Sequence, residues 1–296
     1  MNAKCYMCNE NSLFKRSERV RDNEFLNVFQ CSSCGLISLS DFSHISNEFY
    51  ESSTMRRGDA EQQIAEILEA SKNDDERRFE YVKKKKELFK KEKVVLDYGC
   101  GAGGFLLNLS KLIDKSKLYG IEIEDMTRRF LNDSGIKVVK SVEEYKKNVG
   151  QKVDFVSMFH VLEHLPDPKK CLIELRSILT DTAKIFIEVP NADDALLSIY
   201  KCESFANFVF WSPHLYTFNI KSFEIMAKET GYSLKNIKQI QRYPISNHLY
   251  WLKEGKPNGH KMFDIFNYDR LSYEYEKVLR KNKICDTLMV EFEVQP

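Results

Sequence analysis

An apolar run that ends in a glycine-rich turn constrains the fold of this chain more than any other feature. Val94–Tyr98 is followed by GCGAGG at residues 99–104 and then by the helical pattern FLLNLSKLI at residues 105–113. Glycines let a ligand approach the backbone, and open α/β sheets bind ligands beyond the carboxyl ends of their strands. The segment therefore predicts a strand, a ligand-binding turn and a helix.

Short apolar runs alternate with helical patterns through the rest of the chain. With 43% apolar residues, the chain can bury a full core. Strand and helix patterns at this spacing favour a mainly parallel sheet covered by helices. We therefore expect an α/β fold with a Rossmann-like seven-stranded sheet. Its strands are Val94–Tyr98, Lys117–Ile123, Lys137–Lys140, Val153–Phe159, Ala183–Val189, Tyr232–Tyr243 and Thr287–Val294, and a further helix is expected over Asp269–Lys281.

The glycine turn is compatible with two nucleoside cofactors. The second expected strand ends near Glu122, whose carboxylate can accept hydrogen bonds from both ribose hydroxyls. The turn also satisfies the dinucleotide fingerprint G-x-G-x-x-G. From these residues by themselves, NAD and S-adenosylmethionine both stay open.

The pattern D-x-G-x-G-x-G at residues 97–103 resembles the first motif of class I methyltransferases, which use S-adenosylmethionine. The resemblance implies that Asp97 and the glycines shape the methionyl end of the site and that Glu122 holds the ribose. Such enzymes often place an acid against the adenine, whereas residues 141–143 here read SVE. The expected cofactor-binding residues are Asp97, Gly99, Cys100, Gly101, Gly103, Glu122, Ile123, Ser141, Val142, Phe159 and His160.

Two later segments extend this resemblance. Val153–Pro168 is similar to the segment after the fourth strand of methyltransferases that modify quinones and sugars, and Ala183–Asn191 is similar to their fifth strand. In the quinone-modifying relatives a Glu at the place of His160 joins Glu163 and His164 in a metal site. For this chain, two roles of Glu163 and His164 remain open: binding of a metal, or hydrogen bonds that tie the loop to the sheet.

Two histidines are candidates for the catalytic base. The segment WSPHLYTF at residues 211–218 resembles the part of sugar methyltransferases in which a His, often preceded by Glu, lies near the acceptor. Here Pro213 takes the place of that Glu. Methylation of a hydroxyl requires removal of a proton, which the neutral imidazole of His214 can accept near pH 7. His160 is the second candidate, and a structural role for His214 stays open.

The tail segment QRYPISNHLYWL at residues 241–252 is similar to one in methyltransferases associated with bacterial surface-polysaccharide synthesis. Aromatic faces stack on sugars and polar ends bond hydroxyls, although core packing explains the aromatic residues as well. The expected acceptor contacts are Tyr216, Arg242, Asn247 and His248. Tyr216 belongs to an expected insertion at about 191–218, and Asn247 and His248 belong to one at about 244–285, whereas Arg242 lies in the expected strand Tyr232–Tyr243. Both insertions are part of a methyltransferase domain expected at 93–296.

Four cysteines form two C-x-x-C pairs in a polar N-terminal segment. Cys5, Cys8, Cys31 and Cys34 can surround one tetrahedral zinc, and this spacing is typical of a structural zinc ribbon. We expect a zinc-binding module at 1–45 and a helical linker at 46–92, with helical patterns from Gly58 to Lys93 that include Leu88 and Phe89. The remaining cysteines are expected to be buried thiols.

The leading hypothesis is an S-adenosylmethionine-dependent O-methyltransferase of a sugar, nucleotide sugar or related surface-polysaccharide precursor. Two alternatives stay open: a ribosomal RNA methyltransferase that grips RNA with its zinc ribbon, and a module that binds the cofactor without turnover. A formal net charge of +1 gives no general attraction to nucleic acid. The sequence has no run near the roughly 18 apolar residues of a membrane span, so we expect a cytoplasmic enzyme. The oligomeric state is open.

Overall fold

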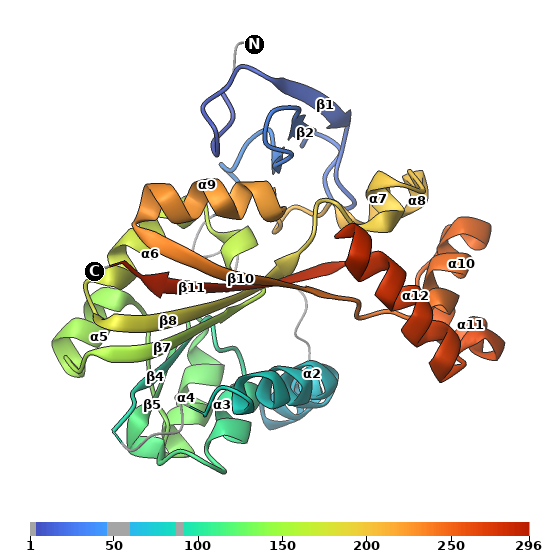
Figure 1. Ribbon diagram of the computed structural model, residues 1–296. Helices are drawn as coiled ribbons and strands as arrows, with labels where there is room; N and C mark the ends of the chain where they lie inside the picture. Colours follow the sequence, from blue (N-terminus) through green and yellow to red (C-terminus); the bar gives the residue numbers. More distant parts are fainter. Residues whose placement is uncertain (1–3, 46–59, 87–91, 296) are drawn as a thin grey trace.

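The computed structural model describes residues 4–45, 60–86 and 92–295 (Figure 1). The predicted helical pattern from Gly58 to Lys93 corresponds to helix α2 (Ala60–Lys83). The rest of the expected linker at 46–59 and 87–91, with Leu88 and Phe89, lies outside the described residues. No helix in the described part of the chain is long and apolar enough to cross a membrane.

Seven strands form the main sheet, as predicted. In spatial order they are β10 (Tyr232–Ile240), β11 (Thr287–Val294), β8 (Leu179–Pro190), β7 (Val153–Phe159), β4 (Val95–Tyr98), β5 (Leu118–Ile121) and β6 (Lys137–Val139). The five strands from β8 to β6 are parallel, whereas β11 is antiparallel to both of its neighbours. The sheet is therefore Rossmann-like, with one antiparallel strand, β11, between β8 and the edge strand β10.

Helices cover both faces of this sheet. They include α3 (Gly104–Leu109), α4 (Asp125–Asp133), α5 (Val142–Asn148), α6 (Pro168–Arg176) and α9 (Ile220–Thr230). Successive strand residues point to opposite faces. Val95 accordingly packs in the core under α2 and α3, while Leu96 packs in the core under α6 and α9. Burial on both faces explains why these strands are almost continuously apolar.

Two helical segments gather at one end of the sheet (Figure 1). The first follows β8 and contains α7 (Ala195–Ser198) and α8 (Glu203–Val209). The second lies between β10 and β11. It contains α10 (Ile245–Glu254), α11 (Gly259–Met262), a turn of 3₁₀ helix (Asp264–Phe266) and α12 (Asp269–Asn282), which confirms the helix expected over Asp269–Lys281. Trp251 joins the two segments, with its ring 5.3 Å from Phe205 and 5.1 Å from Phe208.

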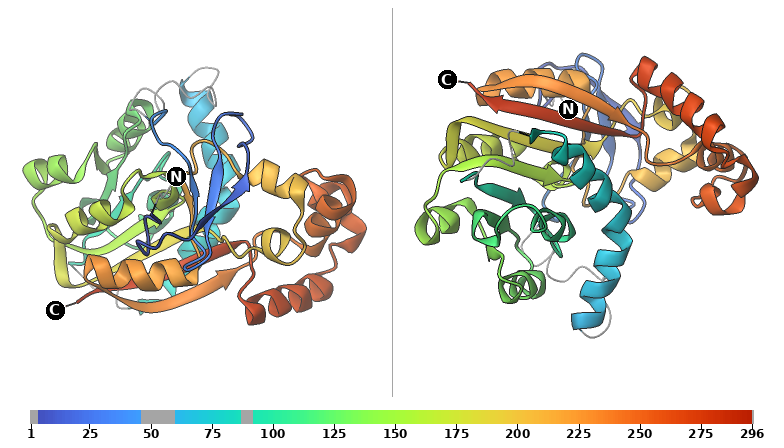
Figure 2. Two further views of the ribbon diagram at one scale, coloured as in Figure 1. Left: turned by 90° about the horizontal axis from the view of Figure 1, so that it is seen from above. Right: turned by 60° about the horizontal axis from the view of Figure 1, so that its bottom comes forward.

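A second, four-stranded sheet contains the N-terminal residues. Its order is β1 (Leu13–Ser17), β2 (Val28–Cys31), β3 (Ile37–Leu39) and β9 (Tyr216–Thr217). The first three strands form an antiparallel meander, whereas β9 belongs to the long segment after β8. Both views in Figure 2 show the blue N-terminal strands against the larger part of the molecule.

Candidate active site

The GCGAGG turn joins β4 to α3 and depends on left-handed backbone conformations. Gly99 has φ +71° and Gly101 has φ +51°, values that glycine adopts without steric cost. A Cβ at Gly99 would lie 2.4 Å from Cγ2 of Val161, so the turn packs closely on the segment after β7. A Cβ at Gly101 would meet no atom within 4 Å. The backbone at Gly101 therefore borders open space that suits a ligand.

Two carboxylates stand beside this turn. Oε2 of Glu122 accepts a hydrogen bond from the backbone N–H of Gly101 at 2.8 Å, which fixes the acid at the end of β5. Asp97 is buried in β4 and accepts a hydrogen bond of 2.5 Å from the hydroxyl of Ser157 on β7. Burial raises the pKa of Asp97 to about 7. The turn thus combines a polar acceptor near solvent with a buried carboxyl that can titrate.

The other expected donor-site residues occupy different surroundings. Ile123 is 44% exposed at the end of β5, while Cys100 is buried against Gly120. Ser141 caps α5 by accepting a hydrogen bond from the N–H of Glu144, and the following Val142 is buried. Phe159 lies edge-on to Phe105 of α3, with ring centroids 4.9 Å apart. Phe159 therefore links the end of β7 to the helix that follows the glycine turn.

The structure brings the two candidate bases together around Glu163, which is fully buried. Nδ1 of His160 donates to Oε1 of Glu163 at 3.1 Å, and Oε2 of Glu163 has no hydrogen-bond partner among the described residues. His164 donates from Nδ1 to the carbonyl of Pro213 at 2.8 Å. The ring of His164 lies 4.9 Å from that of His214. His214 therefore reaches the same cluster as His160, although they are 54 positions apart.

A layer of arginines covers the other side of His160. Glu188, at the end of β8, is fully buried and binds Arg77 and Arg78 of α2 at N–O distances of 2.8 Å each. Nε2 of His160 is 3.4 Å from Oε1 of Glu188 and 3.4 Å from Nη1 of Arg242. Helix α2 is thus tied directly to the cluster and closes one side of the site.

A family model described as a methyltransferase domain matches residues 73–236, which include the glycine turn and the histidine loop after β7. The chain belongs to this methyltransferase family. The family match identifies it as an S-adenosylmethionine-dependent methyltransferase.

The chain is similar to curated relatives in sequence and to a solved structure in fold. Ubiquinone biosynthesis O-methyltransferase of Xanthomonas euvesicatoria pv. vesicatoria is 28% identical over 179 residues, which are 57% of this chain and 74% of the relative. An uncharacterized protein of Methanocaldococcus jannaschii is 33% identical over 182 residues, 60% of this chain and 74% of the relative. The plantazolicin methyltransferase BamL, solved with a triazolic desmethylPZN analog and SAH, has the same fold. It gives a TM-score of 0.52 at 14% identity over 84% of this chain and 94% of that chain.

The surroundings of the two histidines in this methyltransferase shift their pKa values in opposite directions. Burial, together with the charge of His164, lowers the pKa of His214 to about 3, so its imidazole is neutral at pH 7. Burial also lowers the pKa of His160, but hydrogen bonds to Glu163 and Glu188 outweigh burial and the net pKa is raised. His214 is therefore neutral at pH 7, although a pKa this low also limits its strength as a base. The raised pKa of His160 favours its protonated form.

Three of the four residues expected to contact the acceptor have side chains buried in the protein interior. Tyr216 is 2% exposed, and its hydroxyl donates to the carbonyl of Pro166. Asn247 accepts from the N–H of Gly259, and His248 lies 2.8 Å from the hydroxyl of Tyr275 through Nδ1. All three side chains make hydrogen bonds within the protein, and their contact with an acceptor stays a prediction. Arg242 is the member of the set that lies beside the histidine cluster.

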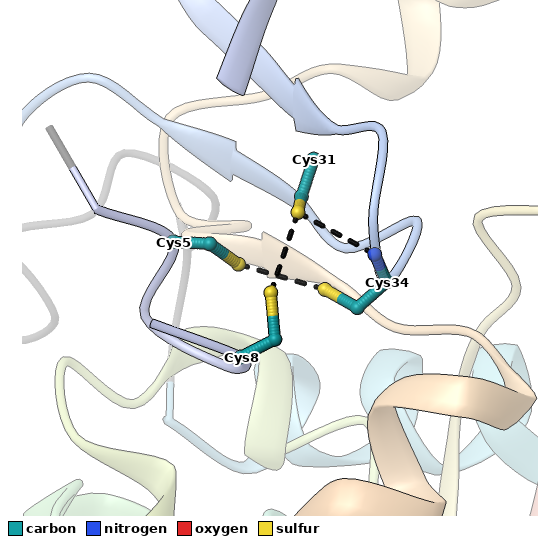
Figure 3. Close-up of side chains that lie close together, drawn as sticks. All are labelled: Cys5, Cys8, Cys31 and Cys34. Carbon is teal, nitrogen blue, oxygen red and sulfur yellow. Dashed lines mark hydrogen bonds between the residues drawn. The ribbon is translucent and has the colours of Figure 1, made fainter. Parts of the chain in front are cut away.

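The four N-terminal cysteines converge on one point (Figure 3). Sγ of Cys5 lies 3.5 Å from Sγ of Cys34, and Sγ of Cys8 lies 3.5 Å from Sγ of Cys31. A tetrahedral zinc with Zn–S bonds of about 2.3 Å has sulfur atoms roughly 3.8 Å apart. The donor set and its geometry therefore fit a zinc ion held by four thiolates.

A second group of three side chains could also hold a cation. The ligand atoms of Glu163, His164 and His214 lie within 4.8 Å of one another. Donation from Nδ1 of His164 to a backbone carbonyl is the arrangement that orients metal-binding histidines. The same atoms can act without a metal, with His214 as base.

Proposed function

We propose that this methyltransferase binds S-adenosylmethionine at the GCGAGG turn and methylates a hydroxyl oxygen, with His214 as the general base. The observation that carries the proposal is the position of a neutral, half-buried His214 in a cluster that continues, through the loop of His160 and Val161, to Gly99 of the turn. A chain of contacts through the loop after β7 thus connects the proposed base to the proposed donor site.

The donor site is proposed from the shape and polarity of the turn. The open space at Gly101 can receive the methionyl part, and the carboxylate of Glu122 can accept hydrogen bonds from the ribose hydroxyls. Ionised Asp97 would attract the positively charged end of the donor. When bound, S-adenosylmethionine supplies an electrophilic methyl group on sulfur.

The protein's own groups then handle the proton. As the hydroxyl oxygen bonds to the methyl carbon and the carbon–sulfur bond breaks, the proton passes from the hydroxyl to the imidazole of His214. Burial raises the pKa of Glu163, but the hydrogen bond from His160 and the charges of the neighbouring histidines together outweigh burial, so the pKa is lowered and Glu163 stays ionised. Its negative charge stabilises the imidazolium that forms.

The acceptor that we favour is a sugar, nucleotide sugar or related surface-polysaccharide precursor. Trp211, whose ring lies 5.6 Å from that of His214, and the exposed Tyr243 offer faces for a sugar ring. Arg242 adds a cation beside His160. A phenolic hydroxyl is the second candidate, because relatives are named ubiquinone biosynthesis O-methyltransferases.

Two measurements test this function in sequence. Calorimetry should show binding of S-adenosylmethionine and of S-adenosylhomocysteine, and none of NAD; binding of NAD with no response to the methyl donor would overturn the donor assignment. Labelled donor should then be offered with nucleotide sugars, polysaccharide fractions, phenolic quinone precursors and ribosomal RNA. Label in a carbohydrate supports the favoured acceptor, while label confined to phenols or to RNA replaces it.

A further inference from the structure

The segment that carries His214 is part of the sheet of the cysteine module. Ser38 of β3 pairs with Tyr216 of β9, and Ile37 pairs with Thr217. The backbone N–H of Leu39 adds a hydrogen bond of 3.0 Å to the carbonyl of Leu215. The base therefore lies two residues before a strand whose partner is supplied by the N-terminal residues.

The loop between β1 and β2 holds the same segment from its other end. Asp22 accepts hydrogen bonds from the N–H of Ser212 at 2.9 Å and from its hydroxyl at 2.6 Å. The N–H of Arg21 donates to the carbonyl of Phe210 at 2.8 Å, and the Arg21 guanidinium lies 4.6 Å from the Trp211 ring. Residues 210–217 are thus bonded to the module on both sides of His214.

The opposite side of this segment contacts the catalytic loop. The N–H of Leu215 donates to the carbonyl of Glu163 at 2.9 Å, next to the bond between His164 and Pro213. The segment is therefore sandwiched between the module and the loop of Glu163. In contrast, the donor-site contacts described above join β4, β5, α3 and β7 to one another, and none of them involves the module.

We propose that the metal-binding module is a positioning element for the catalytic base, and that Asp22 is a positioning residue for His214. The inference rests on the proposed function, since it concerns the base of that reaction. A zinc ion at Cys5, Cys8, Cys31 and Cys34 would fix β2 and β3, and these in turn hold β9 and His214. Loss of the metal then abolishes methyl transfer but leaves donor binding in place.

The first test separates metal loss from donor binding. Cys34→Ser or treatment with a chelator should remove the zinc, increase deuterium uptake at residues 210–217 and abolish methyl transfer. The affinity for S-adenosylhomocysteine should stay within about twofold, because the glycine turn is formed by other elements. Unchanged deuterium uptake in metal-free protein would overturn the proposal.

Asp22 provides a variant that leaves the cysteines intact, in case Cys34→Ser does not fold. Asp22→Ala should retain zinc and donor affinity, increase deuterium uptake at 210–217 and lower kcat at least about tenfold, because it removes two hydrogen bonds to a charged group. Asp22→Asn keeps an oxygen acceptor and should recover part of the loss. The matched control is Glu18→Ala, since Glu18 is an exposed acid of the same module that pairs with Lys15.

A pH profile distinguishes positioning of a base from general damage. With a phenolic acceptor, the kcat of Asp22→Ala should approach that of the wild type as the pH rises toward the pKa of the phenol, about 10, because an ionised acceptor needs no base. With a sugar acceptor, whose hydroxyl stays protonated, the loss in kcat should persist over the same pH range. Equal behaviour of Asp22→Ala and Glu18→Ala in both uptake and kcat would refute the role of Asp22. If the wild-type protein methylates no acceptor, the proposed function fails, while the deuterium-uptake difference still decides whether the module holds this segment.

Discussion

The donor side and the acceptor side of the main sheet are built in different ways. At the glycine turn, the backbone conformations of Gly99 and Gly101 and the hydrogen bond to Glu122 arise within 24 consecutive residues. At the acceptor side, Glu188 binds Arg77 from 111 positions away, and Ser212 binds Asp22 from 190 positions away. The donor side therefore depends on local backbone geometry, whereas the acceptor side depends on side-chain contacts between residues far apart in the sequence.

This difference predicts which substitutions should impair donor binding and which should impair turnover. The donor side should be sensitive to a side chain placed where the turn requires none, and insensitive to changes in distant segments. The acceptor side should lose turnover when one of its gathered residues is removed, while the donor still binds.

The largest effect is expected from Gly101→Val. The new side chain would enter the open space at the turn and should abolish measurable binding of S-adenosylmethionine in calorimetry. Part of any effect could arise from strain, because a β-branched residue is disfavoured at positive φ. Gly150→Val is the control: Gly150 also has positive φ (+69°) but lies in the turn between α5 and β7. Donor binding that survives Gly101→Val would remove the turn from the donor site.

The next effect separates the two histidines. His214→Ala should lower turnover by about a hundredfold to ten-thousandfold, the usual cost of losing a general base, with donor affinity nearly unchanged. His160→Ala should act less on the proton transfer, because its raised pKa favours the protonated form. Single-turnover rates of both variants provide the measurement. Wild-type turnover in His214→Ala with loss in His160→Ala would move the base to His160, and activity in both would indicate an acceptor that is already ionised.

The fold could be predicted from the sequence because its determinants are local. Most of the seven strands are short apolar runs, and the glycine turn marks where the first strand ends. The predicted ends of some strands were less accurate. The strand expected over Tyr232–Tyr243 ends at Ile240 as β10, and the one expected from Ala183 begins at Leu179 as β8. Register with neighbouring strands decides these ends, and it is a long-range property.

The acceptor side could be predicted only in part, for the same reason. A motif drew attention to His160 and His214, but nothing local to Arg77 and Arg78 distinguishes them from other charged residues on a helix. Their role depends on Glu188, which binds them through tertiary contacts. Similarly, Asn247 and His248 resembled acceptor contacts, although their hydrogen bonds are to residues of the same helical insertion.

The smallest effect concerns two buried carboxyls: Asp97, on the donor side, and Asp194, which precedes α7 in the segment after β8. Burial raises the pKa of Asp97 to about 7; burial, with the charge of Asp286 second, raises that of Asp194 to about 8. In the folded state, both pKa values lie above the unfolded value of about 4. At a pH between the unfolded and the folded pKa, each carboxyl therefore holds a proton in the folded state and has lost it in the unfolded state. The free energy of unfolding should therefore fall as pH rises through this window, by up to about 1.4 kcal/mol per unit for each group.

Asparagine variants of these two residues should sharpen the comparison. Asp97→Asn and Asp194→Asn should each flatten the dependence of urea unfolding on pH between about 5 and 7, because neither variant can ionise. Donor affinity should separate them. It should rise as pH passes upward through about 7 in the wild type and in Asp194→Asn, since ionised Asp97 attracts the cationic donor, and it should lose this rise in Asp97→Asn. A donor affinity with the same pH dependence in all three proteins would show that Asp97 does not contact the charged end of the donor, and that the turn binds it through backbone groups and Glu122.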